Sequence, residues 1–75
     1  MNKERLISRW NWYQRIITYP APNWDKETQM DFYFRFHEFV DTVKLCGYQF
    51  IHHSEKGMFD NKYLSVATDV VPLDR

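Results

Sequence analysis

The sequence predicts an α+β fold in which two antiparallel α-helices pack on a C-terminal β-hairpin. Two long segments carry apolar residues at the three-to-four-residue spacing of an amphipathic helix. Pro20 and Pro22 separate these segments, because closely spaced prolines impose an extended backbone. After Gly47, apolar and polar residues alternate as in a strand with one buried face. Residues 1–75 are therefore expected to form a single small globular domain, with an all-α three-helix bundle as the alternative fold.

The first helix is expected over about residues 3–18, followed by a proline-rich turn over 19–24. Asn2 can cap its N-terminus, while Glu4 and Arg15 lie near the ends where the helix dipole favours their charges. Its buried stripe has the spacing i, i+4, i+7, i+11 and consists of Leu6, Trp10, Tyr13 and Ile17. This stripe is expected to face the second helix.

The second helix is expected over about residues 25–46. Asp25 and Glu27 suit its first turn, and Gly47 is suited to the left-handed backbone that often ends a helix. One apolar stripe runs along its length and consists of Phe32, Phe36, Phe39, Val43 and Cys46. The two stripes predict an antiparallel helix pair joined by an aromatic interface.

A β-hairpin is expected over about residues 48–71. Residues 48–52 are rich in aromatic and β-branched side chains, 54–57 suit a turn, and 62–71 alternate between apolar and polar residues. The alternative is a third helix over about 60–69, because several apolar residues also share one helical face: Phe59, Tyr63, Val66 and Val70. The many β-branched residues favour the strand, since they lose rotamer freedom in a helix.

Composition predicts a small folded protein of the cytoplasm. Six Phe, five Tyr and three Trp supply large rings for a core, and a mean hydropathy of −0.64 argues against a membrane span. The N-terminus has no apolar run typical of a secretory signal, and the lone Cys46 cannot form an internal disulfide. The net charge is zero, but residues 1–23 carry four basic side chains and only one acidic one. The first helix is therefore the basic part of the chain.

Trp10 and Trp12 cannot share one core, because helix residues two positions apart point in different directions. Trp12 falls on the side away from the buried stripe. The predicted partner-binding residues on this side are Arg5, Arg9, Trp12, Arg15 and Ile16. Guanidinium groups stack on indole faces and suit carboxylate or phosphate. Three alternatives remain open for Trp12: packing beneath the hairpin, contact with another protein chain, or contact with nucleic acid.

The second helix also carries apolar residues on the side opposite its main stripe, namely Met30, Phe34 and Leu45. A helix that is apolar on two sides has two partners. The hairpin is one candidate for the second partner. A homodimer or another protein is the other candidate, with Met30 and Phe34 as the buried contacts.

The residues that could carry chemistry do not form a recognisable site. His52 and His53 would point to opposite faces of a strand and cannot share a metal ion, and His37 has no ligand at metal-binding spacing. Cys46 falls on the second apolar stripe and is expected to be a buried structural thiol. Gly47 and Gly57 are the only glycines, too few for a phosphate-binding loop. We expect no enzyme, no metal and no cofactor.

The leading functional hypothesis is a small intracellular protein–protein interaction module. It would bind and modulate a larger partner, as phage-encoded or accessory regulators of this size do, without a membrane or a small-molecule substrate. The alternative is a nucleic-acid-binding protein that uses the basic aromatic side of the first helix. The neutral overall charge disfavours this alternative, because such proteins usually have a basic excess.

Overall fold

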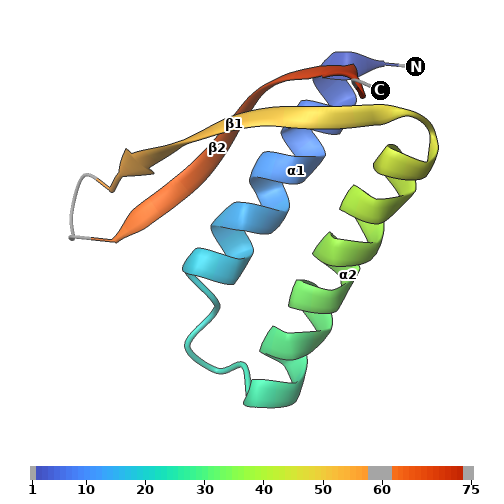
Figure 1. The fold of residues 1–75 in the computed structure, drawn as a ribbon. Coiled ribbons are helices and arrows are strands. Elements are labelled where there is room, and N and C mark those ends of the chain that lie inside the picture. Colours follow the sequence, from blue (N-terminus) through green and yellow to red (C-terminus); the bar gives the residue numbers. More distant parts are fainter. Residues whose placement is uncertain (1, 58–61, 74–75) are drawn as a thin grey trace.

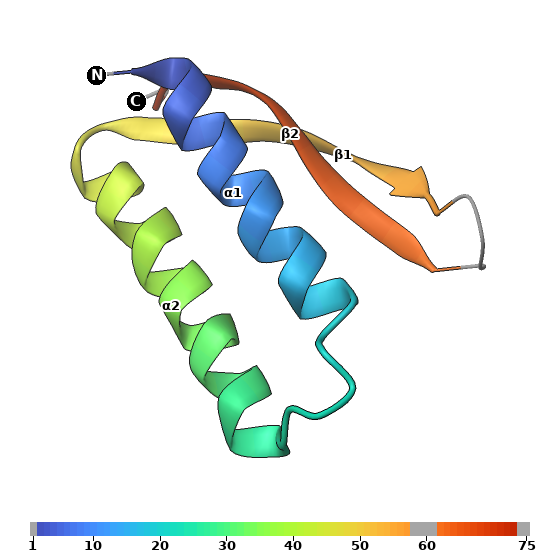
Figure 2. The same cartoon turned by 180° about the vertical axis from the view of Figure 1, so that it is seen from behind.

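Two helices are followed by two strands: α1 (Lys3–Thr18), α2 (Lys26–Leu45), β1 (Tyr48–Lys56) and β2 (Tyr63–Pro72). They belong to a computed structural model that describes residues 2–57 and 62–73. The helices run antiparallel, and the hairpin crosses α1 (Figure 1); from behind, α1 lies between the viewer and the strands (Figure 2). The predicted α+β fold is therefore confirmed. The three-helix alternative is wrong because Tyr63–Pro72 is a strand. Residues 59–61, where that third helix would have begun, lie outside the described residues.

The helix ends follow the capping signals in the sequence. The side chain of Asn2 accepts a hydrogen bond from the backbone N–H of Arg5 at 3.2 Å, and Asp25 accepts one from Thr28 at 2.8 Å. The hydrogen bonds from Thr28 hold the pKa of the Asp25 carboxyl below its usual value. At the other end of α2, Gly47 has a φ of +90°, which side-chain-bearing residues rarely adopt.

The hairpin pairs β1 with β2 in an antiparallel, two-stranded sheet. The pairing is regular from Tyr48 to Ile51, which lies opposite Asp69, and then shifts so that His52 lies opposite Ala67. Thr68 is therefore an extra residue, so the β-bulge lies in β2 and β1 is continuous. Strand β1 extends to Lys56, beyond the predicted start of the turn.

The core is built around Trp10, which is only 4% exposed. Its indole contacts Phe36 of α2 edge-on at 5.4 Å, and it lies 5.9 Å from Phe50 and 5.1 Å from His52 of β1, measured between ring centroids. Other buried residues come from α1, α2 and β2, namely Tyr13, Val43, Ala67 and Val70. Ring contacts of Trp10 and Tyr13 with Phe36 and Phe39 therefore confirm the central part of both predicted stripes as the helix interface. The last position of the predicted α2 stripe is an exception.

That exception is Cys46, which is exposed rather than buried. The prediction of a structural thiol is wrong because α2 ends at Leu45 and Cys46 is already its C-cap residue. The buried stripe stops one turn earlier, at Val43.

Asn11 attaches α1 directly to the backbone of β2. Its amide nitrogen donates to the carbonyl of Ala67 at 3.1 Å, and its amide oxygen accepts from the N–H of Ala67 at 2.7 Å. The side chain thus replaces the neighbouring strand that Ala67 lacks on that edge. Because Ala67 is buried, these hydrogen bonds replace water that the folded structure excludes.

A second link between α1 and β2 is electrostatic. Lys3 Nζ lies 3.1 Å from Asp69 Oδ1, and the N–H of Val70 donates to the same carboxylate at 2.8 Å. The hydrogen bond from Lys3, followed by that from Val70, holds the pKa of Asp69 below its usual value. A lowered pKa means that this link stabilises the fold above the unfolded pKa and weakens as the pH falls through the folded pKa. Both groups are about half exposed, so salt screens the pair.

The helix interface generates the first prediction. Replacing Phe36 by alanine removes a buried ring that contacts Trp10 and Tyr13, and we expect a loss of about 3–5 kcal/mol in unfolding free energy. Phe34→Ala is the matched control, because Phe34 is 58% exposed and its loss should change stability by less than about 0.5 kcal/mol. Urea unfolding measures both. Equal losses in the two variants would show that the assigned helix phase is wrong.

The Asn11 contact generates the second prediction. Asn11→Ala leaves the N–H and the carbonyl of the buried Ala67 without partners, so we expect a loss of about 1–3 kcal/mol. Ser8→Ala, one turn earlier and exposed, should be close to neutral. Urea unfolding compares the two variants, and an Asn11→Ala protein as stable as Ser8→Ala would contradict the proposed anchoring of β2.

Candidate protein-interaction surface

Trp12 is the exposed member of a row of four aromatic rings that links α1 to α2. It is 49% exposed, and its ring meets Tyr13 at 5.1 Å and Phe32 of α2 at 6.1 Å, both edge-on. Trp24, just before α2, stacks flat on Phe32 with centroids 4.8 Å apart and planes inclined by 2°. We call these four residues, Trp12, Tyr13, Trp24 and Phe32, the Trp12 strip. Contacts with its neighbours orient the half-exposed indole.

Two arginines flank the Trp12 strip. The guanidinium of Arg9 lies 5.8 Å from the ring centroid of Tyr13 and 5.7 Å from that of Phe39. The guanidinium of Arg35 lies 5.7 Å from the ring of Phe32, and its Nε is 2.9 Å from the carboxylate of Asp31. The surface therefore combines one exposed indole with positive charge held over adjacent rings, an arrangement that suits cation–π contacts.

The residues predicted to bind a partner on the Trp12 side of α1 have different surroundings in the structure. Trp12 does not pack beneath the hairpin; its ring contacts are with Tyr13 and Phe32, so that alternative is wrong. Arg9 does not cover Trp12 either, because it reaches the ring of Tyr13, one helical turn further along. Arg15 borders a hollow of about 330 Å³ next to Trp12, together with Ser8 and Asn11. Arg5 is exposed and Ile16 is half-buried.

Met30 and Phe34 belong to a second, separate surface. They are 49% and 58% exposed and border a hollow of about 430 Å³ with Lys26, Glu27 and Asp31. Leu45, further along α2, is 90% exposed. The hairpin was one predicted cover for this side of α2, and that expectation is wrong because the hairpin crosses α1 instead (Figure 1). The other predicted cover, a second protein chain, stays a prediction.

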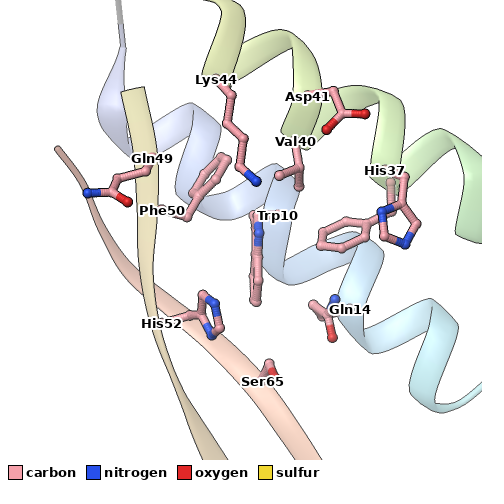
Figure 3. Close-up of a pocket in the computed structure, with 11 residues that line it drawn as sticks. Trp10, Gln14, His37, Val40, Asp41, Lys44, Gln49, Phe50, His52 and Ser65 are labelled. Carbon is pink, nitrogen blue, oxygen red and sulfur yellow. The ribbon is translucent and has the colours of Figure 1, made fainter. Parts of the chain in front are cut away.

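A groove of about 430 Å³ lies where the hairpin meets the helices (Figure 3). Trp10 and Phe36 contribute apolar surface to it, and the polar residues around it come from every element: Gln14, His37, Asp41, Lys44, Gln49, His52 and Ser65. The imidazole of His52 stacks on the indole of Trp10, and that of His37 packs edge-on against Tyr33 at 4.5 Å. Both imidazoles are thus engaged with neighbouring rings.

The polar groups of this groove do not form an assembled catalytic pair. No hydrogen bond or ion pair joins His37, Asp41, Lys44 and His52 among the described residues, whereas a nucleophile needs a base within hydrogen-bond reach. Within residues 2–57 and 62–73, no three His, Cys, Asp or Glu side chains are placed to hold a metal ion. The groove offers mixed charge around apolar rings, and the Trp12 strip remains the candidate site.

Sequence reasoning missed three members of this surface: Trp24, Phe32 as its stacking partner, and Arg35. Phe32 was assigned only to the helix interface, yet it is half-buried and has one face against Trp24. One signal was present, because an apolar residue directly before a helix N-cap often folds back onto that helix. Trp24 is in that position, immediately before Asp25.

No comparison with known proteins indicates a function, so the function is inferred from the geometry of this surface. The chain matches no protein-family model, no curated protein and no solved structure. Neither described helix combines the length and the apolar character that crossing a membrane requires.

Proposed function

We propose that the chain is a small interaction module that binds a larger protein partner through the Trp12 strip. The observation that supports this proposal is the half-exposed indole of Trp12, oriented by Phe32 and Tyr13. Tryptophan and arginine are among the residues most enriched at the positions that dominate binding energy. An indole that is already oriented loses little conformational freedom when a partner covers it.

The surroundings of Trp12 favour a protein partner with an acidic surface. Arg9 and Arg15 lie beside the strip or its neighbouring rings. Their positive charge would speed the approach of a negatively charged partner and orient it. Acidic side chains at the rim of the partner would pair with these guanidinium groups while an apolar pocket covers the indole.

Nucleic acid is the alternative partner, and the charges disfavour it. Arg35 is paired with Asp31, and the chain as a whole is neutral. Affinity for nucleic acid depends on many unpaired cations that neutralise phosphates. The proposal therefore places the chain among accessory factors or inhibitors, phage-encoded ones included, that modulate a protein without catalysing a reaction. A cytoplasmic location is part of the same proposal, since a single exposed thiol suits a reducing compartment.

Trp12→Ala tests the proposed function. We expect this variant to keep its fold and to lose about 2 kcal/mol or more of partner binding, because it removes a central anchor while the Trp10 core is intact. The measurement is capture of partners from a lysate of the native host, followed by titration of the captured protein. Phe34→Ala, an exposed ring on the other side of α2, is the matched control and should bind normally.

Trp10→Ala should unfold the chain, so thermal melts of both tryptophan variants accompany the binding assay.

The dependence of affinity on salt concentration separates the two classes of partner. A nucleic-acid site loses affinity steeply between about 50 and 200 mM salt, whereas an indole-centred protein contact changes little. Micromolar binding of random oligonucleotides that disappears in the double variant Arg5→Ala, Arg9→Ala would favour the alternative. Normal partner capture by folded Trp12→Ala would contradict the proposal.

A further inference from the structure

The two edges of the hairpin differ in whether another strand can reach them. On the edge of β2, the amide of Asn11 occupies the N–H and the carbonyl of Ala67. The bulge at Thr68 interrupts this edge, and Pro72 at its end has no N–H to donate. These are the features by which proteins prevent further strand pairing. The outer edge of β2 is therefore obstructed from Ala67 to Pro72.

The outer edge of β1 is open. Because both polar backbone groups of Ala67 point away from β1, its opposite residue His52 belongs to a pair without mutual hydrogen bonds. The N–H and carbonyl of His52 must then point away from β2. Alternation along the continuous strand gives the same direction to four more residues: Tyr48, Phe50, Ser54 and Lys56. Among the described residues, no backbone group pairs with this edge, and residues 51–56 are exposed.

We propose that β1 pairs in an antiparallel manner with β1 of a second copy of this chain, so that two hairpins form one four-stranded sheet. His52 is the middle residue of the nine-residue strand. With a two-fold axis between the two copies of His52, each of the five outward-facing residues lies opposite an outward-facing residue of the other copy. Phe50 then lies opposite Ser54, and Tyr48 lies opposite Lys56. This interface is separate from the Trp12 strip and goes beyond the proposed function.

Three features favour a second copy as the occupant of this edge. The chain has a net charge of zero, so two copies do not repel each other through their overall charge. The same register places Gln49 opposite Glu55 and Ile51, which is 44% exposed, opposite His53 on the outer face. Glu55 and Lys56, the only acidic residue and the only lysine or arginine of β1, both lie at its end, so the centre of the edge lacks the lysine, arginine, aspartate and glutamate side chains that commonly prevent pairing.

The experiment compares Ser54→Pro with Ser54→Ala. Both remove the hydroxyl, but only proline removes the outward N–H, and it leaves the hydrogen bonds to β2 in place. In sedimentation velocity over about 1 µM to 1 mM, we expect wild type and Ser54→Ala to rise from monomer towards dimer mass. Ser54→Pro should weaken dimerisation at least about tenfold, because the substitution is present in both copies and the dimer therefore loses two hydrogen bonds. Thermal melts check that each variant is folded.

Amide hydrogen exchange of the wild type provides a second readout, which does not depend on the proline variant being folded. The N–H groups of His52 and Ser54 should become protected as the protein concentration rises. Those of His53 and Glu55, which face β2, should be protected at every concentration. A monomer throughout the range would overturn the proposal. So would a dimer that persists in folded Ser54→Pro, or one that Phe34→Ala dissociates instead.

Discussion

The packing of Trp10 is the interaction on which the rest of the structure depends. Its indole contacts α2 through Phe36 and β1 through Phe50 and His52, so a single side chain of α1 joins three elements. A chain of 75 residues buries a small core, and a two-stranded sheet is marginally stable on its own. The hairpin is therefore stable only while it is attached to α1, and Asn11 supplies the polar part of that attachment.

This attachment explains why so many large apolar side chains remain at the surface. Because the hairpin is held on α1, it cannot also cover the side of α2 that carries Met30 and Phe34. Trp12 is likewise left half exposed, because its ring contacts Tyr13 and Phe32 rather than a further layer of the fold. The exposed aromatic surfaces follow from the small number of elements available to cover the two helices.

Much of this fold is predictable from local sequence, and much of the surface is not. Caps, proline positions and apolar spacing fix both helices, because each signal acts within one or two turns. The path of the hairpin depends on contacts between residues far apart in the sequence, such as Asn11 with Ala67, and no periodicity reveals these. The position of Arg9 over Phe39 was missed for the same reason. Cys46 was placed in the core because a helical stripe was extended one turn too far.

The central claim is that Trp10 holds the fold while Trp12, two residues later, is kept available to a partner. Fluorine NMR of the fluorotryptophan-labelled protein tests it directly, with each signal assigned by a single Trp→Phe replacement. On transfer from light to heavy water, the signal of Trp12 should shift clearly and that of Trp10 should stay unchanged, because only exposed fluorine atoms contact solvent. Equal shifts for both residues, or a protected Trp12 in the dilute monomer, would contradict this division of roles.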